Sequence, residues 1–222
     1  MRKLLLTSLT LAGLATASLA AVGLAAPAPA KPDLTRLEAA LDRHETLKPA
    51  SSFAAIADPR QRSLALYAEA FKVIGNPRCQ NCHPVDGLPR QGLDSHPHNP
   101  VIAVRDGDHV VNGPPCAGCP GKANYPVWGD TPRSIPGTPQ WGLAPASMAW
   151  QGKTPGEICR QIKDPSRNGG RSLPQLFDHM AHDGLVGWAW APGAGRAPAP
   201  GTQAQFGALV QAWIDTGAAC PA

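Results

Sequence analysis

Hydrophobic residues recur at helical spacing in the segment between Asp58 and Gly75. Asp58 is a favourable N-cap, and Pro59 occupies the first helical position, where its missing N–H is not needed. Five residues of the segment form an apolar stripe: Leu64, Tyr67, Ala68, Phe71 and Ile74. We predict an amphipathic helix here, which Gly75 and Pro77 bring to an end.

Three segments near the C-terminus begin with the capping-box pattern, in which Ser or Thr is followed three positions later by Glu or Gln. These patterns start at Thr154, Ser172 and Thr202, and the third segment stops at Gly217. Hydrophobic residues follow each start: Ile158, Cys159 and Ile162; Leu176, Phe177 and Met180; and Phe206, Leu209, Val210, Trp213 and Ile214. The pattern predicts three helices, and a further short helix is predicted from Asp33.

Residues 84–145 keep neither helical nor strand periodicity, because 21 of these 62 residues are Gly or Pro. The whole chain has 23 Gly and 25 Pro in 222 residues, which excludes a coiled coil and argues against a compact helical bundle or long strands. Trp128 and Trp141 lie in the irregular region, and disordered segments are poor in aromatic residues. We therefore predict a mainly α, loop-rich fold whose irregular region is ordered, with a disordered linker as the alternative.

The first 30 residues have the three parts of an export signal. Arg2 and Lys3 are basic, the apolar stretch Leu4–Leu24 follows, and Ala28–Ala30 is an A-x-A cleavage pattern. We predict cleavage after Ala30 and a periplasmic location. The alternative is that the segment is not cleaved and anchors the protein in the membrane, as its only attachment there. The formal charge of +4 falls by two when Arg2 and Lys3 are removed. So small a balance gives no reason to expect a nucleic-acid partner.

Residues 79–83 read Cys-Gln-Asn-Cys-His, which is the CxxCH pattern of covalent haem c attachment. The spacing lets the thiols of Cys79 and Cys82 each reach one vinyl group of the porphyrin, and it places His83 beneath the iron. Because haem c is attached to exported proteins, the export signal favours this interpretation. We predict haem c bound through Cys79, Cys82 and His83; a local disulfide or half of a zinc site is the alternative.

A second CxxC pair, Cys116 and Cys119, is followed by Pro120, which cannot ligate iron. Three interpretations stay open for this pair. It forms a local disulfide, it holds a second covalent haem whose axial ligand comes from elsewhere, or it shares a zinc ion with Cys79 and Cys82. The 33 residues that separate the two pairs exceed the usual zinc spacing, which favours the first two.

The two remaining cysteines, Cys159 and Cys220, lie in the first predicted C-terminal helix and just after the last one. In an oxidising compartment such thiols pair. We predict a disulfide between them, which closes a loop of roughly sixty residues and stabilises the fold by about 4 kcal/mol in the loop-entropy model.

The sixth ligand of a haem iron distinguishes electron carriers from enzymes. Methionine ligation raises the reduction potential, histidine ligation gives a lower one, and an open position permits reaction with peroxide. The candidate distal ligands are Met148, Met180, His98 and His179. His96 lies in the same irregular loop as His98, whereas His182 is expected at the surface.

From roughly Leu64 to the C-terminus, the chain resembles a family of exported bacterial c-type cytochromes that are often labelled isoquinoline 1-oxidoreductase subunit. Its most specific part is the run from Lys163-Asp164-Pro165 to Arg167–Arg171. The other matching positions are Leu143–Pro145, Met148, Trp150, Cys159, Ile162, His179, Met180, Asp183, Leu185, Val186, Trp188, Trp190, Pro192 and Gly193. The resemblance implies a haem c protein that passes electrons to redox partner proteins, including a molybdenum hydroxylase. Relatives are expected to carry CxxCH twice, so Pro120 is a departure.

These observations together predict a signal peptide over residues 1–30 and a single cytochrome c-like domain over residues 31–222. Residues 58–150 form its haem-binding part, and residues 151–222 form a C-terminal helical part. We expect a periplasmic electron-transfer protein that transforms no substrate. The alternatives are a haem peroxidase-like enzyme with an open sixth iron site, and a haem-free structural module held by zinc or a disulfide.

Overall fold

The computed structural model describes residues 46–98, 143–192 and 196–222, together with the backbone of four short strands between residues 103 and 132. All of these residues belong to one compact unit, residues 32–222. The predicted signal segment, the helix predicted from Asp33, and Cys116 and Cys119 lie outside the described residues. Within the part that is described, no helix is long and apolar enough to cross a membrane.

The described residues are mainly helical, as the pattern predicted. The longer helices are α2 (Pro59–Ile74), α4 (Pro155–Lys163), α5 (Leu173–His182) and α7 (Gln203–Asp215). The short helices are η1 (Ala50–Phe53), α3 (Pro77–Gln80), η3 (Ala146–Met148), α6 (Gly184–Gly187) and η4 (Trp188–Trp190). The sequence pattern did not predict these short helices.

The described strands pair into antiparallel two-stranded ladders within the irregular region. The pairs are β1 (Arg90–Gln91) with β2 (His96–Pro97), β3 (Ala103–Arg105) with β4 (Asp108–Asn112), and β5 (Val127–Trp128) with β6 (Thr131–Pro132). The part of residues 84–145 that the structure describes is therefore made of turns and short hairpins.

Helix α2 begins and ends where predicted, but it buries a different face. The side chain of Asp58 accepts a hydrogen bond from the Gln61 N–H (2.7 Å), and Gly75 is the C-cap. The buried residues are Ser63, Leu66, Tyr67, Glu69, Ala70, Val73 and Ile74. The predicted stripe is wrong at Leu64, which is only half-buried, and at Ala68, which is exposed. The polar residues Ser63 and Glu69 occupy part of the buried face and form hydrogen bonds there. A prediction based on hydrophobic residues alone does not include them.

The three predicted capping patterns all begin helices in the structure. Each first residue donates its backbone N–H to the side chain three positions later, at 2.7 to 3.1 Å. The pairs are Thr154 with Glu157 in α4, Ser172 with Gln175 in α5, and Thr202 with Gln205 in α7. These bonds satisfy N–H groups that a helix start leaves unpaired.

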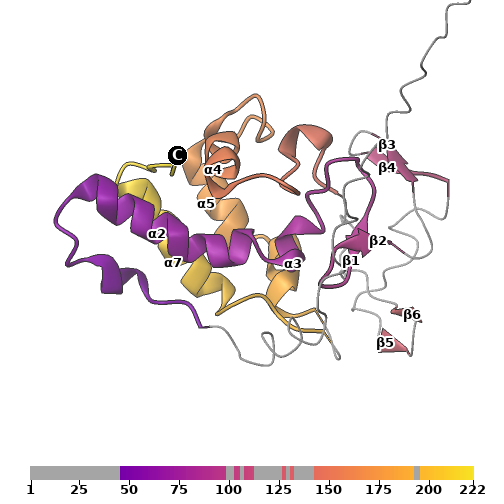
Figure 1. Cartoon of the computed structure of the whole chain (residues 1–222), viewed down its shortest axis with the longest axis horizontal. Coiled ribbons are helices and arrows are strands. Elements are labelled where there is room, and N and C mark those ends of the chain that lie inside the picture. Colours follow the sequence, from indigo (N-terminus) through magenta and orange to yellow (C-terminus); the bar gives the residue numbers. More distant parts are fainter. Residues whose placement is uncertain are drawn as a thin grey trace, which may run out of the picture. The chain divides into compact units, whose positions relative to one another are not determined.

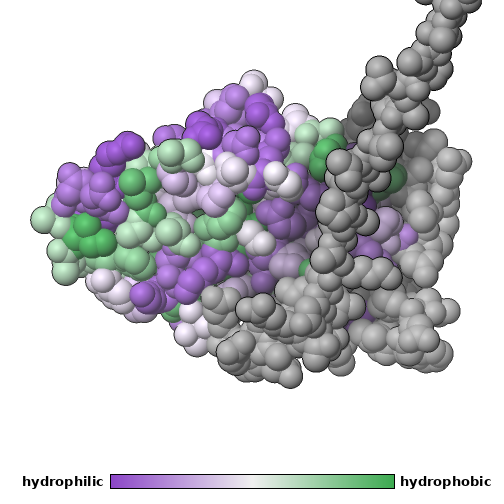
Figure 2. Space-filling model, in the orientation of Figure 1, coloured by the Kyte–Doolittle hydropathy of each residue, from purple (hydrophilic) through white to green (hydrophobic). Residues whose placement is uncertain are grey.

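The hydrophobic core forms where α7 packs against both α2 and α5 (Figure 1). Gly207 of α7 allows the close approach to α5, because a Cβ at this position would lie 2.6 Å from that of Ala181. The face seen in Figure 2 mixes hydrophilic and hydrophobic residues over the described elements. Among the described residues, Val85 is the large hydrophobic side chain that stays exposed, at 57%.

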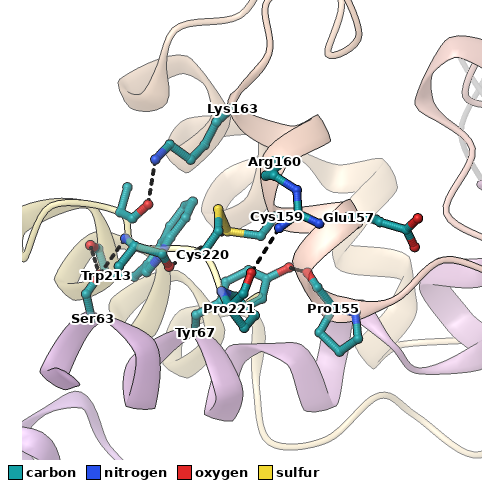
Figure 3. The surroundings of a disulfide bond; sticks show 12 residues. Ser63, Tyr67, Pro155, Glu157, Cys159, Arg160, Lys163, Trp213, Cys220 and Pro221 are labelled. Atoms are coloured by element: carbon teal, nitrogen blue, oxygen red, sulfur yellow. Dashed lines mark hydrogen bonds between the residues drawn. A yellow bond between two sulfur atoms is a disulfide. The ribbon is translucent and has the colours of Figure 1, made fainter. Parts of the chain in front are cut away.

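The predicted disulfide between Cys159 and Cys220 is confirmed, and it fastens the C-terminal tail to α4 (Figure 3). Two hydrogen bonds support the same contact: Arg160 donates to the Pro221 carbonyl (3.0 Å), and Lys163 donates to the Ala218 carbonyl (2.7 Å). Ser63 of α2 makes two more, because its hydroxyl donates to the Trp213 carbonyl (3.2 Å) and accepts from the Ala219 N–H (2.9 Å). The tail is thereby fixed to α4 and to α2.

Candidate functional site

The CxxCH segment lies on a short helical turn that directly follows α2. The side chain of Asn76 caps α3 by accepting from the Arg78 N–H (2.9 Å). Beyond α3, the Cys82 N–H donates to the Cys79 carbonyl and the His83 N–H to the Gln80 carbonyl, both at 3.1 Å. These i to i+3 bonds keep the motif helical, so Cys79 and Cys82 lie on the same side of the turn.

The described residues enclose a cavity of about 340 Å³, and the whole CxxCH triad of Cys79, Cys82 and His83 lines it. The volume falls in the range of ligand-binding pockets. Much of the wall is apolar: Ile74, Leu143, Ile162, Leu176, Leu185, Val186 and Phe206. An apolar wall of this kind suits a large hydrophobic ligand.

Three of the four candidate distal ligands line the same cavity: Met148, Met180 and His179. The fourth, His98, is not among the lining residues and lies next to the β1–β2 hairpin. His96 is exposed and hydrogen-bonded to Asp94. The structure thus brings together residues from three separate parts of the sequence at one site.

The thiols of Cys79 and Cys82 are free in the structure, so the local disulfide considered from the sequence is not present. Burial raises the pKa of Cys79 to about 12, and the neighbouring Cys82 adds to this effect. Burial also raises the pKa of Cys82 to about 11, against the charge of Arg78. Both side chains are therefore neutral S–H groups at neutral pH. No cluster of three or more metal-binding side chains occurs within the described residues.

The imidazole of His83 is fixed in one orientation by two contacts. Its Nδ1 lies 2.8 Å from the Met148 carbonyl oxygen, and its ring stacks on Trp150 with centroids 3.7 Å apart and planes 4° from parallel. Burial lowers the pKa of His83 to about 4, with the hydrogen bond to Met148 opposing the shift and the charge of His179 adding to it. At neutral pH the ring is uncharged, donates through Nδ1 and keeps the Nε2 lone pair for another partner.

Residues 143–151 hold the motif from outside by backbone hydrogen bonds. The Ala144 N–H donates to the Cys82 carbonyl (3.0 Å), and the Trp150 N–H donates to the His83 carbonyl (2.9 Å). These contacts join positions more than sixty residues apart. No local sequence signal could have predicted them, although Trp150 belongs to the pattern shared with the resembling family.

Three arginines line the cavity: Arg78, Arg167 and Arg171. No Asp or Glu is among the described lining residues, and none of the three forms a salt bridge within the described part of the chain. Burial and the charge of Arg196 lower the pKa of Arg78 to about 10, so it stays protonated at neutral pH. Its guanidinium lies 5.7 Å from the ring centroid of Trp188. Within the described residues, the wall therefore carries positive charge and no carboxylate, although Arg167 interacts electrostatically with Asp164 outside the wall.

Two further donors of the wall are buried without a hydrogen-bond partner, Gln161 Nε2 and Trp188 Nε1. An unsatisfied buried donor costs free energy. Together with the arginines, these donors suit a ligand that brings negatively charged oxygen atoms into the cavity. The sequence alone did not assign these residues to a binding site. Which charges line the cavity, and which donors lack a hydrogen-bond partner, can be seen only in the folded structure.

The two lining arginines of the 167–171 turn are positioned by Asn168 and two glycines. The buried Asn168 side chain donates to the Ile162 carbonyl (2.8 Å) and accepts from the Arg171 N–H (2.8 Å). Gly169 and Gly170 adopt φ values of +77° and +76°, which other residues rarely tolerate. The asparagine and glycines of this run therefore form the turn that brings Arg167 and Arg171 to the cavity.

At the end of α5, His179 pairs with Asp183 through Nδ1 and Oδ2, 3.0 Å apart. The other carboxylate oxygen of Asp183 accepts from the Leu185 N–H (2.7 Å). His182 makes a similar pair with Asp178 at 2.9 Å, but its side chain is exposed, as predicted, and does not line the cavity.

Comparisons with protein-family models, with curated proteins and with solved structures gave no match for this chain. The site is therefore interpreted from its own residues.

Proposed function

We propose that this chain is an exported c-type cytochrome that carries electrons through haem c attached to Cys79 and Cys82, with His83 as an iron ligand. One observation carries the proposal. Both thiols and the His83 ring line a single apolar cavity, with the thiols unpaired and the ring held through Nδ1. In metal sites, a ligating histidine usually donates its other ring N–H to a carbonyl or carboxylate.

The charges and donors of the wall support haem as the occupant. Haem is a large apolar ring with two carboxylates, and the described lining of the cavity combines apolar residues with three arginines and no carboxylate. The unpaired donors of Gln161 and Trp188 are further partners for carboxylate oxygens. Pairing these groups removes the cost of leaving them buried and unsatisfied.

Each part of the site then has a defined task. The thiols of Cys79 and Cys82 would each add across one vinyl double bond, with sulfur on one carbon and hydrogen on the other, so attachment would need no oxidant. His83 offers Nε2 to the iron while Met148 and Trp150 hold its ring. Bound haem supplies a one-electron couple. The apolar wall excludes water, and the arginines offset the charge of the carboxylates.

The proposed setting is the periplasm, with redox proteins as partners. The export signal motivates this location, and the family resemblance motivates a molybdenum hydroxylase as one partner. The segment that follows His83 reaches the surface at the exposed Val85, and it offers such a partner access close to the attachment site.

Mass spectrometry of the protein from a host with the haem-attachment machinery tests the proposal. We expect the mature chain to carry the mass of at least one haem, and we expect Cys79→Ser with Cys82→Ser to remove one haem equivalent. The matched control is Cys116→Ser with Cys119→Ser, which leaves the haem at the first pair in place. An unchanged haem mass after substitution of Cys79 and Cys82 would show that the proposed site is wrong.

A further inference from the structure

The cavity holds a second imidazole besides that of His83, at His179. The two rings come from elements almost one hundred residues apart. Both side chains line the same cavity, so a ligand that fills it lies against both.

Nδ1 of His179 is occupied, and Nε2 is not. The Asp183 carboxylate holds Nδ1 at 3.0 Å and is itself held by the Leu185 N–H. Within the described part of the chain, Nε2 has no hydrogen-bond partner. His83 has the same pattern, with the Met148 carbonyl in place of the carboxylate. Both imidazoles therefore show the outer-shell hydrogen bond that is typical of metal-ligating histidines.

Met148 already makes two other contacts next to the cavity. Its carbonyl oxygen bonds Nδ1 of His83, and Nδ1 points away from the atom that would face the iron. Its Cε packs against Gly169, where a Cβ would lie only 2.8 Å away. Met148 therefore contacts His83 through its backbone and the 167–171 turn through its methyl group, and ligation of iron would cost its side chain the second contact.

Met180 follows His179 directly, but its side chain has a packing role. It is 6% exposed and belongs to the hydrophobic core, as does Leu176 one helical turn earlier. The buried face of α5 thus already uses Met180, whereas the His179 side chain keeps 31% of its surface exposed.

We propose that Nε2 of His179, with Asp183 as a positioning residue, is the second axial ligand of the iron, opposite His83. The inference rests on the proposed function, because it needs the haem attached at Cys79 and Cys82. It excludes an open sixth position and therefore a peroxidase-like site. It also assigns a low reduction potential relative to a His/Met centre, because imidazole stabilises ferric iron better than a thioether does.

The test uses the full chain with Cys116→Ser and Cys119→Ser, so that spectra report only the haem at Cys79 and Cys82. We expect the ferric protein to be low-spin by electron paramagnetic resonance and to lack the weak red absorption band of a thioether–iron bond. His179→Ala should become high-spin, and added imidazole should restore the low-spin signal. Rescue by imidazole distinguishes a lost ligand from a misfolded chain.

Three further variants complete the test. His182→Ala, on the same helix and with the same kind of Asp partner, should keep the low-spin spectrum. Met180→Leu should also keep it. Asp183→Asn should stay low-spin but show a raised reduction potential, since a carboxylate partner makes the imidazole a stronger donor.

The outcomes separate the two proposals. A high-spin parent protein, or a low-spin His179→Ala together with a high-spin Met180→Leu, would overturn the assignment of His179 while the attached haem upholds the proposed function. A colourless parent protein without haem mass would overturn both.

Discussion

At the scale of single residues, buried polar side chains are as informative as the hydrophobic ones. Ser63 is fully buried and bridges α7 to the C-terminal tail. Glu69 accepts from the Lys48 N–H (2.9 Å) and pairs with Lys72 (3.0 Å). Each such group avoids the cost of an unmade hydrogen bond. His83 differs from them, because it is half-buried and one of its ring nitrogens has no partner within the described residues.

The lowered pKa of His83 predicts a pH dependence of stability in the haem-free chain. A histidine in the unfolded chain titrates near the ordinary value of 6.5, and burial moves the pKa of His83 to about 4. Between these values the unfolded state binds more protons, so stability is complete above the upper value and falls as the pH drops towards the lower one. The loss is bounded by about 3 kcal/mol.

Urea unfolding of the Cys79→Ser, Cys82→Ser chain at a series of pH values measures this effect. Substituting His83→Gln in that chain should flatten the dependence between the two pKa values. The exposed His182 provides the control, since His182→Gln should leave the curve as it was. Equal curves with and without His83 would contradict the prediction.

At the scale of elements, local side-chain chemistry fixes where the helices begin. In α4 the hydroxyl of Thr154 accepts from the Glu157 N–H (3.3 Å), and the Glu157 carboxylate accepts from the Thr154 N–H (2.7 Å). The hydrogen bonds from Thr154 also hold the pKa of Glu157 below its ordinary value. A start signal of this kind lies within four residues, so a sequence pattern can contain it completely.

Removing the α4 cap should destabilise the protein modestly. Thr154→Ala deletes one acceptor for the first turn, and such changes cost about 1 kcal/mol. Thr154→Ser keeps the hydroxyl and should remain close to the parent. Thermal unfolding of the two variants side by side measures the difference, and equal midpoints would show that the cap contributes nothing.

The same reasoning explains what the sequence could and could not predict. The starts of α2, α4, α5 and α7 and the disulfide depend on local chemistry or on cysteine pairing, and the sequence predicted them. Haem attachment at the CxxCH motif stays a prediction. The buried face of α2 and the loop that holds His83 depend on contacts between distant segments. Arg78 lies next to Cys79 in the sequence, but its role depends on the absence of a carboxylate in an assembled wall. Such properties exist only after folding.

At the scale of the whole molecule, the disulfide encloses one of the segments that line the cavity. The disulfide joins Cys159 of α4 to Cys220, with a sequence separation of 61. The enclosed loop contains α5, α6 and α7, and with them the cavity residues His179, Met180 and Trp188. Cys159 is completely buried, whereas Cys220 is partly buried against the core, so the bond joins the core to the C-terminal tail.

Removing the disulfide should therefore destabilise the fold strongly without detaching the haem. The loop-entropy model gives a loss of about 4 kcal/mol for a loop of this length, which denaturant unfolding of Cys159→Ala with Cys220→Ala measures. Reduction of the parent protein should lower its stability by a similar amount while its haem mass stays constant, because thioethers resist thiol reductants. If the double variant unfolds at the parent's denaturant midpoint, the disulfide does not stabilise the elements around the cavity. If its haem mass falls to zero, attachment itself depends on the tail being fixed to α4, and the site at Cys79 and Cys82 is coupled to a bond on a different helix.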